Sequence, residues 1–523
     1  MPLEIPAEFN IAEEFLARPA REHPDRIAIR GEPSAVRYGE LAELANRVGN
    51  ALRERGCERG DRILIVLPDS VEFVASFFGA AKIGAIPVPV NSMARASDDY
   101  EYWLSDSGAR SAIVHASILG EFCQAERKIG LAEMTVVGTS AAQRKALPGN
   151  ALLWDEWLAG ASRELEAYPT RAEDPAFFLY TSGSGGTPKA AVHRHQDMLV
   201  TSRSFAGDTL ELRSDDIAFS VSKLFFAYGL GNGMYFPFSV GASTVLLPDR
   251  PKPENVAEVV GRRRPTVFFS VPTFYAALLR EVERGLKLEF SSVRMAVSAG
   301  EPLPAEIFER FHKKFGLEIL DGIGSTEMLH MFLSSRPGQA RPGSCGVEVS
   351  NYEARIVDES GEPVRENEIG NLWVKGKSAF AEYWNKPELT ARTKIGDWVV
   401  TGDKFSRDQD GYYHYCGRAD DMMKVSGMWV SPGEVENILL GHPVVAEAAV
   451  VACADTMGLL RPAAYVVLRP GAEPGPQLAS EIQQWVRARL VSYKCPQEIR
   501  FLDELPKTVT GKIQRFRLRG GAG

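Results

Sequence analysis

Short, continuous apolar runs alternate with longer mixed segments from about residue 60 to about residue 350. The short runs predict buried strands, and the longer segments predict helices. The expected strands are Arg62–Leu67, Ala85–Val90, Ser111–Ala116, Thr135–Thr139, Thr266–Val271, Met295–Gly300 and Leu317–Gly324, with a further unit between Ile217 and Leu247. The expected helices are Ser70–Gly84 and two that end near Gly285 and Lys314. Repeated strand–helix–strand units with fully apolar strands indicate parallel sheets covered by helices on both faces.

The pattern changes twice toward the C-terminus. From about Ser350 to Tyr415 helical periodicity is absent and short strands alternate with turns, so we expect a β-rich subdomain without helices. After a short polar join at Gly417–Asp421 the pattern restarts. The expected elements are a strand-like Lys424–Ser431, helices at Pro432–His442 and Leu478–Lys494, and strands at Val444–Ala454 and Ala463–Arg469. The predicted fold class is α/β: a large N-terminal domain of layered, parallel-rich sheets with a β-rich subdomain at 350–417, and a small α+β C-terminal domain at 422–523.

The composition of the 523-residue chain is that of an ordinary globular protein, 45% hydrophobic and 24% charged. Its net charge of −8 argues against general affinity for nucleic acid or for an anionic membrane. No apolar stretch is long enough to span a bilayer, and MPLEIPAEFN lacks the apolar core of a signal peptide. Six scattered cysteines argue against structural zinc and fit a reducing cytoplasm. His193 and His195 are interpreted as a surface pair at a helix start, because no third metal ligand is nearby.

The segment TSGSGGTPK, from Thr181 to Lys189, is the clearest chemical motif. It follows the apolar run Ala176–Tyr180, which predicts a buried strand. Glycines let backbone N–H groups approach phosphate oxygens, hydroxyls add donors, and the lysine adds a positive charge. The spacing is not that of a Walker loop, so any nucleotide is held differently from a P-loop ATPase. By itself, the segment also fits a flexible surface turn.

Three further motifs follow in order. GIGSTE, from Gly322 to Glu327, follows a predicted strand, where Glu327 is suited to Mg²⁺ or, alternatively, to a helix capping box. TGD ends at Asp403, which fits either a ribose-binding carboxylate or a plain Asp turn. PKTVTGK, from Pro506 to Lys512, is either a solvated tail or a turn that delivers a lysine into a cleft.

With these four motifs in this order, the whole chain resembles the adenylate-forming acyl-CoA synthetase superfamily. The resemblance implies a large N-terminal domain and a small, mobile C-terminal domain that rotates on a hinge at 418–421. It implies that a carboxylate and ATP first form an acyl-AMP and pyrophosphate, and that the acyl group then passes to a thiol. ATP, Mg²⁺ and coenzyme A are the implied cofactor and co-substrates.

The resemblance also implies roles for individual residues. Catalysis is assigned to Lys512 between carboxylate and α-phosphate, to Glu327 on the metal together with Thr181, to the hinge residue Asp420, and to Lys424 and Gly427 of the loop that faces the site after rotation. The expected nucleotide-binding residues are Thr181, Ser182, Gly183, Ser184 and Lys189 for the phosphates, Asp403 and Arg418 for the ribose, and Gly300, Glu301, Pro302, Asp321, Gly322, Ile323, Ser325 and Thr326 around the adenine and the phosphates.

The chain departs from the family pattern at three places. Gly185 stands where a threonine is usual, so a hydroxyl that would contact the phosphates is lost. Ala190–Ala191 stand where Gly-Val is usual. Ile323 replaces an aromatic residue that stacks on adenine, so this stacking is expected to be weaker or supplied elsewhere.

The segment LFFAYGLGN, Leu224–Asn232, lies where the family builds its acyl pocket. Its aromatic, alanine and glycine residues suit a flat ring and disfavour a long alkyl chain. This segment, with DGIGSTEMLH and KVSGMWVSP, looks most like benzoate-CoA ligases and their 2-aminobenzoate-using relatives. The implied substrate residues are Phe226, Ala227, Tyr228, Gly229, Ser298, Ala299, Ile323, Gly324 and His330. His330 is suited to accept a hydrogen bond from an ortho amino or hydroxyl group; alternatively, Phe226, Tyr228 and His330 belong to an ordinary core.

The predicted activity is ATP-dependent conversion of an aromatic acid to its CoA thioester. One alternative is an aryl-AMP ligase that loads a carrier-protein thiol. Another is a non-catalytic protein that binds a nucleotide or an aromatic acid; Lys512, Glu327 and Asp403 argue against it, and Gly185 argues slightly for it. The expected partners are a small aromatic acid and coenzyme A, with no nucleic acid and no membrane, for a cytoplasmic monomer or homodimer.

Overall fold

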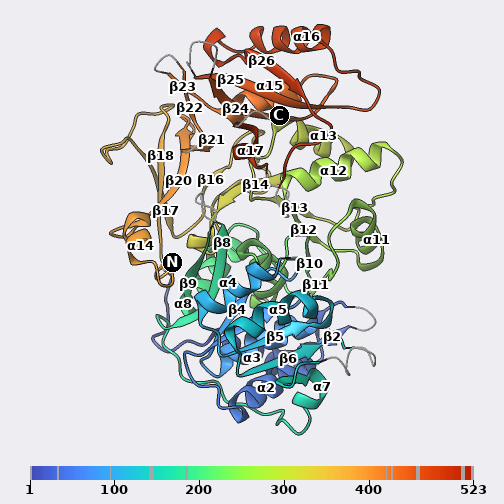
Figure 1. Cartoon of the computed structure of the whole chain (residues 1–523), viewed down its shortest axis with the longest axis vertical. Coiled ribbons are helices and arrows are strands. Elements are labelled where there is room, and N and C mark those ends of the chain that lie inside the picture. The colour runs from blue at the N-terminus through green and yellow to red at the C-terminus, as the bar shows by residue number, and fades with distance from the viewer. Residues whose placement is uncertain are drawn as a thin grey trace.

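The structure is a computed structural model of the chain, and it describes residues 3–31, 35–94, 96–139, 147–182, 187–419, 421–425, 428–454, 460–507 and 513–519. One parallel sheet, in the order β4-β3-β5-β6-β7, occupies the end of the molecule opposite the C-terminal domain (Figure 1). Its strands are β3 (Arg62–Val66), β4 (Ile86–Pro89), β5 (Ser111–His115), β6 (Glu133–Val137) and β7 (Ala151–Leu153). The helices around it are α2 (Tyr38–Glu54), α3 (Val71–Lys82), α4 (Ser97–Ser107), α5 (Leu119–Ile129) and α7 (Trp154–Trp157), with the 3₁₀ turn η2 (Ala116–Ile118).

A nine-stranded sheet forms the middle of the molecule, in the order β16-β15-β14-β13-β12-β10-β11-β1-β2. Its strands are β1 (Ile27–Ile29), β2 (Val36–Arg37), β10 (Ile217–Ser220), β11 (Ser243–Val245), β12 (Val267–Ser270), β13 (Met295–Ser298), β14 (Ile319–Gly324), β15 (Met331–Ser334) and β16 (Val347–Glu348). The strands from β1 to β14 pair in parallel, and β2, β15 and β16 add antiparallel edges. The predicted burial on both faces is confirmed in β12, where Phe269 joins the main core and Phe268 joins the core under α12 and α13.

Helices cover both faces of this central sheet. They are η1 (Glu13–Ala17), α1 (Arg18–Glu22), α8 (His195–Thr201), η3 (Ser202–Gly207), α9 (Ala227–Leu230), η4 (Gly231–Tyr235), α10 (Phe236–Ser239), α11 (Pro253–Arg263), α12 (Pro272–Glu283) and α13 (Ala305–Phe315). Crossing helices approach closely at Gly79 of α3, where a Cβ atom would lie 2.7 Å from the carbonyl oxygen of Ala45 in α2. In the part of the chain that is described, no helix combines the length and the apolar character needed to cross a membrane.

The β-rich region is an antiparallel sheet of β17 (Tyr352–Val357), β18 (Gly370–Gly376), β19 (Lys394–Ile395), β20 (Trp398–Arg407) and β21 (Tyr413–Arg418). The expectation that this region lacks helices is wrong, because α14 (Pro387–Thr393) lies within it. Pro387 occupies the first helical turn, which suits its fixed φ, and Glu388 is in the same turn. The helix buries no residue, so it has no apolar face to reveal it in the sequence.

The C-terminal domain, orange to red in Figure 1, contains a three-stranded sheet with helices against it. Its elements are β22 (Met423–Val425), β23 (Met428–Val430), α15 (Pro432–Leu440), β24 (Val445–Ala454), β25 (Leu460–Leu468), α16 (Pro476–Arg487), η6 (Ser492–Lys494), β26 (Glu498–Phe501) and α17 (Arg515–Arg519). Two expectations need correction. Lys424–Ser431 is a hairpin of β22 and β23 rather than one strand, and α16 ends at Arg487 because the chain becomes extended at Val491.

Candidate active site

The Gly-rich segment begins on β8 (Pro175–Ser182) and ends on β9 (Pro188–Arg194), and these two strands pair in an antiparallel manner. Thr181 lies directly opposite Lys189 in this pair of strands. Opposite residues of an antiparallel pair project to the same face, so the hydroxyl and the ammonium are presented together. Gly183, Ser184 and Gly185 lie outside the described residues, and so does the side chain of Ser182.

Lys189, Glu327 and Tyr383 form one cluster of charged and polar side chains. The Lys189 Nζ atom donates to the Tyr383 hydroxyl at 2.5 Å and lies 3.4 Å from the Glu327 carboxylate, to which the Tyr383 hydroxyl also donates. The Lys189 and Glu327 side chains are only 17% and 15% exposed. Burial alone would raise the pKa of Glu327, but the Lys189 charge and the Tyr383 hydrogen bond hold it below its ordinary value. Glu327 is therefore a carboxylate that faces a cation.

Tyr383 was not predicted from the sequence. It belongs to the strap Phe380–Trp384, which runs along β9: the backbone N–H of Ala381 donates to Val192 at 2.8 Å, and that of Trp384 donates to Ala190 at 2.9 Å. This pairing brings a tyrosine from far along the chain onto Lys189 and Glu327. No motif marks the strap in the sequence, so only the tertiary structure identifies it.

Ser325 and Glu327 resolve the two interpretations of GIGSTE. The Ser325 hydroxyl accepts a hydrogen bond from the Met328 N–H at 3.2 Å and caps η5 (Thr326–Met328). Glu327 does not close a capping box; its side chain turns to Lys189. Ser325 is therefore the residue that caps the helical turn, and Glu327 belongs to the charged cluster.

Asp403 and Arg418 lie side by side across β20 and β21. The Arg418 guanidinium donates to Asp403 Oδ1 at 3.0 Å and to the Thr401 carbonyl at 3.2 Å. The backbone N–H of Asp403 donates to the Thr401 hydroxyl at 3.1 Å, which fixes the turn. The charge of Arg418 also acts on the Tyr383 hydroxyl, so this pair lies near the cluster around Lys189.

Three polar residues lie side by side on adjacent strands of the central sheet. Ser270, the last residue of β12, pairs with Ser298, the last residue of β13, and Ser298 pairs with Asp321 within β14. All three are buried; the Ser298 hydroxyl interacts with the Asp321 carboxyl, and among the described residues the Ser270 hydroxyl has no hydrogen-bond partner. Burial raises the pKa of Asp321 well above its ordinary value. An unpartnered buried hydroxyl at the carboxyl ends of parallel strands points to a ligand site.

His330 stands in a box of aromatic rings. Its ring centroid lies 4.5 Å from that of Phe236, 5.0 Å from that of Phe205 and 5.4 Å from that of Tyr228. The Tyr228 hydroxyl donates to the Ser270 carbonyl at 3.2 Å, which joins the box to the strand ends. Burial lowers the pKa of His330 to about 3, so the ring is neutral.

Two glycines among the expected substrate residues lie against neighbouring backbone, with no room for a side chain. A Cβ atom on Gly229 would lie 2.1 Å from the Lys223 carbonyl oxygen, and one on Gly324 would lie 2.5 Å from that of His330. Ala227 is buried beside them. Phe226 differs: among the described residues its ring stacks only on Phe225, at 4.3 Å, so the structure does not bring it to His330.

The other expected site residues lie around this edge of the sheet. Ala299 is buried after β13, and Gly300 follows it with a φ of 91° that suits glycine. Glu301 accepts a hydrogen bond from the Thr273 N–H at 3.3 Å. The remaining positions are the half-buried Ile323 and the buried Gly322 on β14, the exposed Pro302, and Lys424 on β22. Asp420, Gly427 and Lys512 lie outside the described residues.

A buried ion pair anchors the segment Leu224–Asn232. The Lys223 Nζ atom lies 3.7 Å from an Asp69 oxygen and donates to the Asp249 carbonyl at 2.6 Å, while the other Asp69 oxygen accepts the Leu224 N–H at 2.9 Å. Both ionic side chains are about 5% exposed or less. The pair therefore anchors the start of the segment that carries Tyr228.

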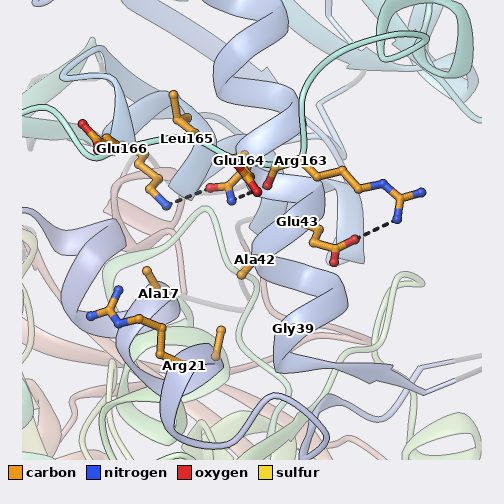
Figure 2. Close-up of a pocket in the computed structure, with 12 residues that line it drawn as sticks. Ala17, Arg21, Gly39, Ala42, Glu43, Arg163, Glu164, Leu165 and Glu166 are labelled. Carbon is orange, nitrogen blue, oxygen red and sulfur yellow. Dashed lines mark hydrogen bonds and ion pairs between the residues drawn. The ribbon is translucent and has the colours of Figure 1, made fainter.

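Asp69→Ala is expected to lower the free energy of unfolding by about 3–5 kcal/mol, because it leaves the buried Lys223 charge and the Leu224 N–H unpaired. The matched control is Glu43→Ala. Glu43 pairs with Arg163 at 3.3 Å beside a separate pocket of about 470 Å³ (Figure 2), and both side chains are exposed. An exposed pair contributes about 1 kcal/mol or less. Urea denaturation measures both variants, and equal shifts would contradict the anchoring role.

Comparison with known proteins identifies the family. The profile "AMP-binding enzyme" matches residues 16–384, and "AMP-binding enzyme C-terminal domain" matches residues 434–512. A benzoate–CoA ligase of Thauera aromatica is 43% identical over 99% of this chain and 97% of its own. The crystal structure of the anthranilate CoA ligase AuaEII with anthranoyl-AMP superposes with a TM-score of 0.92, at 38% identity over 99% of this chain and 98% of that one. A benzoate CoA ligase from Burkholderia xenovorans LB400 gives a TM-score of 0.89, at 40% identity over 98% and 100%.

The chain belongs to the AMP-binding enzyme family, the adenylate-forming synthetases that the four motifs indicated. It is an acid–thiol ligase that uses ATP and coenzyme A. The predicted α/β fold with a separate C-terminal domain is confirmed.

Proposed function

We propose that this enzyme converts a benzoate-type aromatic acid to its CoA thioester through an aryl-AMP intermediate. The observation that carries the proposal is the aromatic box around His330, which adjoins the polar residues Ser298 and Asp321. A flat aromatic ring makes favourable contacts with aromatic side chains such as Tyr228 and Phe236. The relatives that match almost the whole chain act on benzoate or anthranilate by their names.

The charged cluster suits the phosphates of ATP. In the described ranges no group of three His, Cys, Asp or Glu side chains could hold a metal by itself. Mg²⁺ commonly takes one or two carboxylates and completes its shell with phosphate oxygens and water. Glu327, kept ionised beside Lys189, fits that requirement, so we assign it to the metal of Mg-ATP, with Thr181 nearby. The metal would neutralise phosphate charge as pyrophosphate leaves.

The reaction requires two displacements. In the first, a carboxylate oxygen of the acid attacks the α-phosphorus, the bond to pyrophosphate breaks, and aryl-AMP forms. In the second, the CoA thiolate attacks the acyl carbon and AMP leaves with the electron pair. We assign Asp403 and Arg418 to the ribose and Lys189 to the β- and γ-phosphates; the contacts of Arg418 with Asp403 and of Lys189 with Glu327 support this assignment. The family resemblance assigns Lys512 to the meeting of carboxylate and α-phosphate.

Two displacements at one centre need different surroundings, so we propose that the C-terminal domain rotates about 418–421 between them. This rotation would replace the segment of Lys512 with the β22–β23 hairpin, which carries Lys424 and Gly427. Asp420→Pro would restrict the hinge. It is expected to impair at least one half-reaction, and wild-type rates in both would contradict the rotation.

The first test is a substrate panel. AMP release from ATP, Mg²⁺ and CoA is measured with benzoate, 2-aminobenzoate, 4-hydroxybenzoate, phenylacetate, acetate and octanoate. We expect turnover confined to the benzoates and dependent on CoA. AMP release without thioester formation would favour loading of a carrier-protein thiol, and no turnover with any aryl acid would contradict the proposal.

His330 is expected to distinguish among the benzoates. Because its ring is neutral, one of its two nitrogens is an acceptor that suits a hydrogen bond from an ortho amino group. His330→Leu is expected to lower kcat/KM for 2-aminobenzoate relative to benzoate by about tenfold, which corresponds to one lost hydrogen bond. The ratio of the two kcat/KM values measures the effect. An unchanged ratio would mean that His330 only packs against the ring.

A further inference from the structure

His193 is a second buried histidine, and each of its two ring nitrogens faces an oxygen atom. His193 of β9 is fully buried, with its Nδ1 atom 3.0 Å from an Asp197 oxygen and its Nε2 atom 2.8 Å from the Thr326 carbonyl oxygen. His193 and His195 were expected to form a surface pair, and this expectation is wrong because both side chains are buried. Thr326 directly precedes Glu327, so His193 connects β9 to the charged cluster.

Both ring nitrogens of His193 have a hydrogen-bond partner. A carbonyl oxygen only accepts, so Nε2 carries a proton. The same Asp197 oxygen that faces Nδ1 also accepts the Arg194 N–H at 3.0 Å, and the Arg194 guanidinium lies 3.1 Å from the other oxygen. These contacts fix the Asp197 carboxyl group beside Nδ1. The imidazole ring is therefore held at both of its nitrogens.

We infer that His193 is a positioning residue for Glu327. Its Nε2–H fixes the carbonyl of the Thr326–Glu327 peptide, while the Phe380 N–H donates to the Glu327 carbonyl at 2.7 Å on the other side. These two hydrogen bonds fix the backbone carbonyls of Thr326 and Glu327. They thereby orient the Glu327 carboxylate toward Lys189. Asp197 in turn orients the imidazole ring. This inference rests on the proposed role of Glu327 as the ligand of Mg-ATP.

His195 provides a matched control two residues away. It is also buried, at 1% exposure, but its Nδ1 atom accepts the Ile11 N–H at 3.2 Å and faces the N-terminal segment. Burial lowers the pKa of His195 to about 4, so its ring is neutral. The two histidines therefore share burial and location in the chain, and they differ in their hydrogen-bond partners and in their connection to Glu327.

The experiment compares His193→Gln, Asp197→Asn and His195→Gln by calorimetric titration with Mg-ATP and with ATP in the presence of a chelator. Outer-shell partners of a metal ligand change metal affinity by about 10- to 100-fold when replaced. We expect both His193→Gln and Asp197→Asn to weaken Mg-ATP binding by about tenfold or more, with metal-free ATP bound as in the wild type. His195→Gln is expected to change neither, although it lowers stability.

Steady-state kinetics adds a second readout. The His193 variant is expected to raise the KM for ATP, with partial recovery at high Mg²⁺, while the KM for the aromatic acid stays within about twofold of wild type. The inference would be overturned if ATP binding were weakened equally with and without Mg²⁺. It would also be overturned if His195→Gln changed Mg-ATP binding and the KM values in the same way as His193→Gln. The titration needs no aromatic acid, so it tests His193 even if the substrate panel contradicts the proposed function. A wild-type affinity that is indifferent to Mg²⁺ would instead refute the metal role of Glu327.

Discussion

Glu327→Gln is expected to lower kcat/KM for ATP by about 100- to 1,000-fold, the range seen when one charge-stabilising group is removed from an active site. Glutamine keeps the size of the side chain and can still accept the Tyr383 hydroxyl, so the local packing survives. What it loses is the negative charge that faces Lys189 at 3.4 Å and that would bind the metal. The burial of Glu327 makes this loss larger than at an exposed site, because water screens the charge less.

The measurement is pyrophosphate release at varied ATP and Mg²⁺. Glu348→Gln is the matched control: its carboxylate also accepts a tyrosine hydroxyl, from Tyr413 at 2.6 Å, but it lies on β16 outside the charged cluster. We expect this variant to stay within about twofold of wild type, as is usual for substitutions away from catalytic groups. Comparable losses in both variants would mean that Glu327 acts only through the fold.

The sequence predicts those parts of this structure that depend on local pattern. The apolar runs that became β3, β12 and β13 are visible because each strand is buried on both faces, so almost every residue in it is apolar. Helix α14 is hard to recognise for the opposite reason, since it buries no residue fully and only the partly buried Leu389 packs against the core. The sequence of the β22–β23 hairpin predicts one strand because both arms carry β-forming residues.

The candidate site also contains residues that sequence motifs reveal and residues that they do not. Lys189, Glu327, Asp403 and Arg418 lie in recognisable motifs, and the structure brings Lys189 to Glu327 and Asp403 to Arg418. Tyr383 lies in no such motif and reaches Lys189 across 194 positions of the chain, through a strap that pairs with β9. Such contacts follow from tertiary packing, which a local pattern does not encode.

His193 is a second residue whose environment the local sequence does not reveal. In the sequence VHRHQD the two histidines look equivalent, and polar neighbours suggest a surface. Only the fold shows that one contacts Asp197 and Thr326 while the other contacts Ile11. The protonation of a buried histidine depends on these partners, so its chemistry follows from three-dimensional contacts rather than from its position in a motif.

Lys512→Ala is expected to abolish aryl-AMP formation while sparing the second half-reaction. The acid and the α-phosphate are both anionic, and two unit charges at about 4 Å repel by roughly 4 kcal/mol at an effective dielectric constant near 20. A lysine between them would offset that repulsion, and about 4 kcal/mol corresponds to roughly 1,000-fold in rate. Lys512 lies outside the described residues, so its role is inferred from the PKTVTGK motif and from the family.

Two assays separate the half-reactions: aryl-AMP formation from ATP and the acid, and thioester formation from synthetic aryl-AMP and CoA. Lys507→Ala is the control in the same motif, because Lys507 is engaged by Glu447 at 2.6 Å and is not assigned to the reaction. We expect Lys507→Ala to retain both activities and Lys512→Ala to retain only the second. Aryl-AMP formation by Lys512→Ala at the wild-type rate would contradict the mechanism. Loss of both activities would instead mean that the lysine is needed after the first displacement, because synthetic aryl-AMP no longer requires the two anions to meet.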